Sequence, residues 1–75
     1  MSRLPVITDR EALRLLQRAG FYVDRVRGSH TILLHPHKPG VRIVLAVHGE
    51  DLHPSELRRL LRAAQMSAED FRKFL

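Results

Sequence analysis

The stretch HTILLHPHKPGVRIVLAV, residues 30–47, carries the strongest secondary-structure signal in the chain. From His30 the residues alternate between two faces until Pro36 interrupts the run, as expected for a strand. A second strand is predicted by four apolar residues at every second position, namely Val41, Ile43, Leu45 and Val47. Between the two lies Pro39-Gly40, a pair that suits the central positions of a type II turn. Because the connection is short, we expect the two strands to pair as an antiparallel hairpin.

The segment before this hairpin predicts a helix followed by a further strand. Thr8 and Glu11 have the spacing of a capping box, which starts a helix. One apolar stripe follows at helical spacing and consists of Ala12, Leu15, Leu16 and Ala19. Gly20 suits the left-handed residue that ends a helix. Residues 21–27 then favour a short strand, which Gly28 interrupts.

The segment after the hairpin predicts two more helices. Pro54 suits a first helical position, and an apolar stripe follows at Leu57, Leu60, Leu61 and Ala64. Ser67 is a candidate cap for a last short helix carrying Phe71 and Phe74. The expected fold is therefore an α+β domain over residues 1–75, with helices on one face of a three-stranded antiparallel sheet. Its expected core consists of Leu15, Leu16, Phe21, Ile43, Leu45, Leu57, Leu60 and Leu61.

Composition narrows the class of protein. The 75 residues include no Cys, have a net charge of +5 and are 44% hydrophobic. This composition excludes a disulfide scaffold and a disordered tail. No apolar run approaches the length of a membrane span. A cytoplasmic protein is expected. The pI near 11.1 favours an anionic partner, either a nucleic acid or an acidic protein.

The segment Arg25-Val26-Arg27-Gly28-Ser29-His30 is the best candidate for chemistry. Two guanidiniums can pair with phosphate, Gly28 allows a nucleic-acid backbone to approach, and a neutral His30 ring can accept a proton from a ribose 2′-hydroxyl. Such a reaction needs no metal. The alternative interpretation makes His30 a partly exposed residue at a hairpin edge.

A metal site is not expected, although the chain has five histidines. His30 and His35 fall on opposite faces of a strand, and His37 lies in the following turn. No phosphate-binding loop, dinucleotide fingerprint or nucleophile elbow is present, so no cofactor is expected either.

Several short motifs occur in order along nearly the whole chain: Gly20-Phe21, Arg25, Gly28-Ser29-His30, His48-Gly49, Leu57 and Ser67-Ala68-Glu69-Asp70-Phe71. In these motifs the sequence resembles the HicA family of mRNA interferase toxins from type II toxin–antitoxin systems. This resemblance implies a fold similar to double-stranded RNA-binding domains, cleavage of mRNA with His30 as the catalytic residue, and a HicB-type antitoxin as protein partner.

Three hypotheses follow. In the first, the protein is an RNA endonuclease in which His30 transfers the proton, His48 is a candidate second site residue, and the RNA-binding residues are Arg25, Arg27, Gly28, Ser29, Lys38, His48, Arg58, Arg59 and Arg62. In the second, the protein is a non-catalytic RNA-binding module of the same fold. In the third, the basic surface serves an acidic protein partner.

The sequence departs from the usual family pattern at three places: Ala46 stands where Pro is common, Ser55-Glu56 where Gly-Thr is common, and Gln65-Met66 where Gly is common. Glu56 matters most for binding, since a carboxylate suits a helix N-terminus but repels an approaching phosphate.

Overall fold

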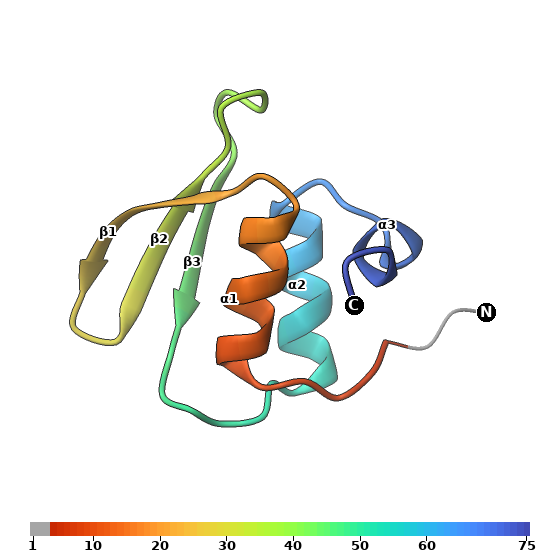
Figure 1. Cartoon of the computed structure of the whole chain (residues 1–75). Coiled ribbons are helices and arrows are strands. Elements are labelled where there is room, and N and C mark those ends of the chain that lie inside the picture. The colour runs from red at the N-terminus through yellow and green to blue at the C-terminus, as the bar shows by residue number, and fades with distance from the viewer. Residues whose placement is uncertain (1–3) are drawn as a thin grey trace.

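The computed structural model describes residues 4–75, and Met1–Arg3 lie outside the described residues. The element order is α1 (Asp9–Arg18), β1 (Tyr22–Arg27), β2 (His30–Leu34), β3 (Arg42–Ala46), α2 (Pro54–Ala63) and α3 (Ala68–Arg72). The strands form one antiparallel sheet in the order β1-β2-β3, and α1 and α2 lie on the same side of it (Figure 1). The predicted α+β order of helix, three-stranded antiparallel sheet, helix and short helix is confirmed.

The N-terminus of α1 has the predicted capping box. The Glu11 amide donates to Thr8 Oγ1 at 3.1 Å, and the Thr8 amide donates to Glu11 Oε1 at 3.1 Å. Glu11 accepts a further hydrogen bond from the Thr8 hydroxyl, and these bonds lower the pKa of the Glu11 carboxyl. Two first-turn donors that a helix leaves unpaired are thereby satisfied.

Both long helices end in the same hydrogen-bonded motif. At the end of α1 the Gly20 amide donates to the Gln17 carbonyl and the Phe21 amide to the Leu16 carbonyl. Gly20 has φ 103°, in the left-handed region that glycine adopts without strain. Since Phe21 takes part in this helix end, β1 begins one residue later than the sequence pattern predicts.

At the end of α2 the corresponding bonds run from Gln65 to Arg62 and from Met66 to Leu61. Gln65 has φ 57° and is the one non-glycine residue with positive φ among the residues that the structure describes. It therefore occupies, with a side chain, the position that Gly20 occupies at the end of α1.

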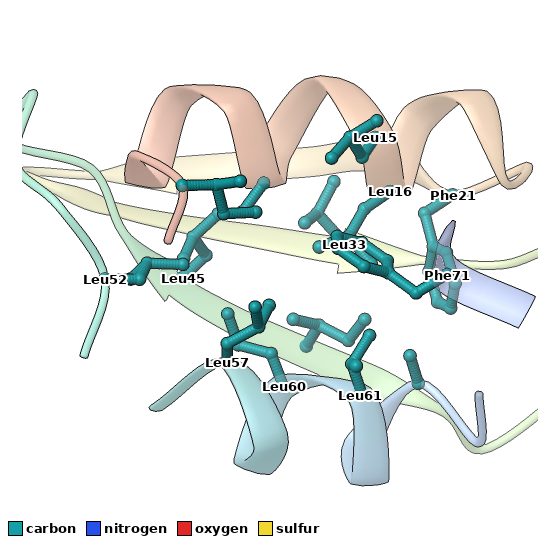
Figure 2. Close-up of a cluster of buried hydrophobic side chains, with 14 of the residues drawn as sticks. Leu15, Leu16, Phe21, Leu33, Leu45, Leu52, Leu57, Leu60, Leu61 and Phe71 are labelled. Atoms are coloured by element: carbon teal, nitrogen blue, oxygen red, sulfur yellow. The ribbon is translucent and has the colours of Figure 1, made fainter. Parts of the chain in front are cut away.

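The core lies between the sheet and the two long helices. Leu33 from β2 and Leu45 from β3 face leucines of α1 and α2, and Phe71 of α3 enters from the side (Figure 2). Leu33, Ile43 and Phe71 have no exposed surface. All eight predicted core residues are buried, so the predicted core is confirmed.

The side of the sheet away from the helices is the surface on which the candidate site lies. Thr31, Leu33, Ile43 and Leu45 are buried on the helix side, and the residues between them point the other way. No helix or strand of the described chain covers this second side (Figure 1), which we call the open face. By register it consists of three cross-strand rows: Tyr22, Leu34 and Arg42; Arg25, Ile32 and Val44; Arg27, His30 and Ala46.

A β-bulge in β1 determines which of its residues join the open face. Val23 pairs with Leu33, but the next pair is Arg25 with Ile32, so Asp24 is the extra residue. Strict alternation would separate Tyr22 from Arg25 and Arg27. The bulge places all three on the same side.

None of the helices in residues 4–75 has the length and apolar character that crossing a membrane requires.

Candidate functional site

His30 is the first residue of β2, directly after the tight turn formed by Gly28 and Ser29. Its side chain is exposed on the open face, between Arg27 of β1 and Ala46 of β3 in the same cross-strand row. The side chain of Arg27 therefore leaves the backbone at the position beside His30. This arrangement is suited to holding an anion next to a group that can exchange a proton.

Gly28 is needed for the conformation of the turn that precedes His30. Its φ of 58° lies in the left-handed region, whereas a Cβ built at Gly28 would meet no atom within 4 Å. The constraint is therefore backbone geometry, and the space beside the turn is free for a ligand to approach the main chain.

His48 lies in the loop after β3, at the same end of the sheet as His30. The Val47 amide donates to the Ser29 carbonyl at 2.8 Å, so β3 and the turn before His30 stay joined up to the residue preceding His48. The side chain of His48 is exposed. The pattern predicted a strand as far as Val47, but β3 ends at Ala46, so His48 belongs to the loop that follows the strand.

The loop of His48 is held by a buried carboxylate from α1. Asp9 is 2% exposed and accepts hydrogen bonds from the amides of His48 at 2.7 Å, Gly49 at 3.1 Å and Glu50 at 3.3 Å. Burial is the largest single influence and raises the pKa of Asp9, but the amide hydrogen bonds together outweigh it and leave the pKa below its ordinary value. The carboxylate of Asp9 thus fixes the backbone of this loop.

Two further contacts strengthen this attachment. The Asp9 amide donates to the Glu50 carbonyl at 2.9 Å, and the Leu52 amide donates to the Ile7 carbonyl at 2.8 Å. Arg10 lies over the same loop: a Cβ built at Gly49 would be 3.6 Å from Arg10 Nε. A cation from α1 therefore adjoins the loop that carries His48.

Lys38, one of the candidate RNA-binding residues, lies at the opposite end of the sheet from His30. Its Nζ donates to the Ala64 carbonyl at the end of α2 at 3.0 Å and lies 5.6 Å from the centre of the Phe21 ring. The first contact is typical of a structural cation at a helix C-terminus, and the second is a cation–π contact. The structure does not bring Lys38 together with His30.

The arginines of α2 lie in the helix layer. Arg58, Arg59 and Arg62 are exposed, whereas the residues of α2 that contact the core are Leu57, Leu60 and Leu61. The candidate RNA-binding residues therefore form separate groups. Arg25, Arg27, Gly28, Ser29 and His30 are together at one end of the sheet, and the three arginines of α2 are outside the open face.

Two other histidines have structural hydrogen bonds. The His37 amide donates to His35 Nδ1 at 3.0 Å, so the proton of a neutral His35 ring is on Nε2, which then donates to the Ala19 carbonyl at 3.2 Å. The His35 ring also packs edge-on against Phe21, with 4.8 Å between the ring centres. Across residues 4–75 no three His, Asp or Glu side chains gather as metal ligands would.

A protein-family model matches most of the chain. The family is described as the HicA toxin of bacterial toxin-antitoxin, and the match covers residues 10–66. The chain belongs to the HicA toxin family. The matched segment runs from the second residue of α1 to Met66, and it includes the turn of His30 and the loop of His48. No curated protein matches the chain.

Membership of the HicA family gives the protein a coarse identity as the toxin of a toxin–antitoxin system. The observed α+β order is consistent with the double-stranded-RNA-binding-domain-like fold that the resemblance implies. A toxin of this kind has an antitoxin as its partner. Asp9, one residue before the HicA match, is not among the candidate residues, because its hydrogen bonds reach 39 to 41 positions along the chain and leave no local pattern.

Proposed function

We propose that this HicA-family toxin is an mRNA interferase, a metal-independent endoribonuclease that inhibits translation and is neutralised by a HicB-type antitoxin. The observation that carries the proposal is His30, exposed at the end of the open face and beside Arg27, in a chain that matches a toxin family. The basic turn before His30 and the net charge of +5 support a polyanionic substrate.

The proposed reaction uses the substrate's own nucleophile. The neutral His30 ring accepts the proton of a ribose 2′-hydroxyl, and the 2′ oxygen attacks the adjacent phosphorus. The bond from phosphorus to the 5′ oxygen breaks, and the departing oxygen takes up a proton from water. The products are a 2′,3′-cyclic phosphate and a 5′-hydroxyl. In this reaction Arg25 and Arg27 neutralise the phosphate charge that develops.

A cleavage assay tests the proposal. The parent protein, His30→Ala and His37→Ala are incubated with a defined single-stranded RNA in EDTA, and the ends of the products are identified. His37→Ala is the matched control, because that imidazole is exposed at the other end of the sheet and its amide, which bonds His35, is retained. We expect cyclic phosphate ends from the parent and His37→Ala, and intact RNA with His30→Ala.

The alternative function is an RNA-binding module without catalysis. Intact RNA with all three proteins, when circular dichroism shows them folded and a gel shift shows RNA bound, would establish that alternative.

Purified antitoxin expressed from a neighbouring reading frame provides the second test of the proposed function. Its addition is expected to abolish cleavage by the parent protein.

A further inference from the structure

The open face is a basic surface. Arg25, Arg27 and Arg42 are exposed on it, together with His30. The only acidic residue in the three strands is Asp24, the unpaired residue of the bulge. Successive rows are about 7 Å apart along the strands, so the cations are spread over the whole face. This distribution suits an extended chain of phosphates better than one isolated anion.

The same face has exposed apolar side chains between its cations. Tyr22 is 47% exposed and Val44 is 42% exposed. Ile32, on the central strand, is only 4% exposed and does not belong to the core on the helix side. Arg25 is the next open-face residue after Tyr22 along β1, and an exposed aromatic ring on a basic face provides a stacking surface that unpaired bases use. In a duplex the bases are paired with each other, and such rings would have no base to contact.

We propose that the open face is the binding surface for single-stranded RNA, with Tyr22 stacking on an unpaired base and Arg42 contacting a phosphate. The RNA runs from the row of Tyr22 and Arg42 to the row of His30, where it is cut. This inference rests on the proposed RNA substrate and adds two binding residues that the sequence pattern did not single out.

The competing surface is the helix layer, where α2 presents Arg58, Arg59 and Arg62. Binding of duplex RNA through helices would use this layer and would leave Tyr22 in solvent. The two surfaces can be compared fairly, because each offers exposed arginines whose replacement by Gln removes the same charge.

The experiment measures binding of a fluorescein-labelled 2′-O-methyl RNA 12-mer, which cannot be cut through its 2′ oxygen. The sheet-face pair Arg25→Gln with Arg42→Gln is compared with the helix-face pair Arg58→Gln with Arg62→Gln. We expect the sheet-face pair to weaken binding at least tenfold and to reduce the slope of log K against log salt by about 1.4, about 0.7 for each phosphate that is no longer neutralised. The helix-face pair is expected to stay within twofold of the parent.

Tyr22 supplies a second test that does not depend on charge. Tyr22→Ala is expected to weaken binding about tenfold, and Tyr22→Phe to restore it, because stacking needs the ring and not the hydroxyl. Circular dichroism checks that each variant is folded. Equal losses from the two arginine pairs, a larger loss from the helix-face pair, or unchanged binding by Tyr22→Ala would overturn the inference.

The assay separates this inference from the proposed function. If the parent cuts no RNA but the 12-mer binds through Tyr22 and Arg42, the endonuclease is wrong and the binding surface stands. If the parent cuts RNA while sheet-face variants bind the 12-mer as the parent does, the endonuclease stands and the surface is wrong. Loss of antitoxin binding alone in the sheet-face variants would assign the open face to the protein partner and reject the RNA.

Discussion

Asp9 is a single side chain that joins two distant parts of the molecule. Replacing it in Asp9→Asn keeps the shape, but it puts an amide N–H₂ group or a neutral oxygen against three backbone N–H donors. We expect the free energy of unfolding to fall by about 1–3 kcal/mol, the usual cost of losing hydrogen bonds to a charged acceptor. Urea unfolding at pH 7 measures this.

The matched control for Asp9→Asn is Glu11→Gln. It removes one negative charge from the same first turn of α1, yet Gln can serve in a capping box. Equal destabilisation by the two substitutions would mean that the helix dipole, and not the attachment of the His48 loop, explains the effect.

The lowered pKa of Asp9 also predicts a pH dependence. Folding favours the ionised carboxylate, so its contribution to stability is present in full above the unfolded pKa of about 4 and is lost as the pH falls through the lower folded pKa. The difference in unfolding free energy between the parent and Asp9→Asn should therefore be constant from pH 7 to 5. It should shrink below pH 4, as urea midpoints at each pH will show, and a constant difference down to pH 2.5 would contradict this.

Lys38 is expected to matter for stability and not for RNA. Lys38→Met removes the hydrogen bond to the Ala64 carbonyl and the cation over Phe21. The expected loss is about 1 kcal/mol of unfolding free energy, since the apolar stem is retained. Binding of the RNA 12-mer should change less than twofold, and a tenfold loss would place Lys38 in the binding surface.

At the scale of the element, the backbone at the end of α2 is strained at Gln65, and a substitution can relieve this strain. Gln65 adopts φ 57° in the motif that Gly20 completes at the end of α1. We expect Gln65→Gly to raise the unfolding free energy by about 1 kcal/mol, because a left-handed residue with a side chain costs about that much. Thermal unfolding of Ala63→Gly, at an exposed helical position just before this helix end, should show the opposite sign. Destabilisation by Gln65→Gly would show that the Gln side chain makes a compensating contact.

The elements themselves were largely predictable from sequence, because their signals are local. Thr8 and Glu11 stand three positions apart, Pro54 opens α2, and the alternation from Val41 to Val47 identifies β3. The grouping of the basic residues was not predictable in the same way. Whether Arg27 and Arg58 share a surface depends on which side of the sheet the helices cover, and no spacing along the chain states that.

At the scale of the whole molecule, stability depends on one core beneath two helices. Leu33 has no exposed surface and lies at the centre of that core (Figure 2). Leu33→Ala is expected to cost about 2–5 kcal/mol, a large part of the total stability of a domain this small. Val26→Ala on the edge strand, where Val26 is 60% exposed, should cost less than about 0.5 kcal/mol. Urea midpoints measure both, and similar shifts would contradict the asymmetry.

The bulge at Asp24 has a consequence for how such a surface can change during evolution. Asp24 has no partner in β2, and the pairs on either side of it continue in step. Deletion of Asp24 would therefore restore strict alternation and leave Tyr22, Arg25 and Arg27 on the same face with the same partners. A single codon gained or lost at this position changes the length of the strand without exchanging the side chains offered to a ligand. Relatives that differ by one residue between Val23 and Arg25 are therefore expected to present the same open face.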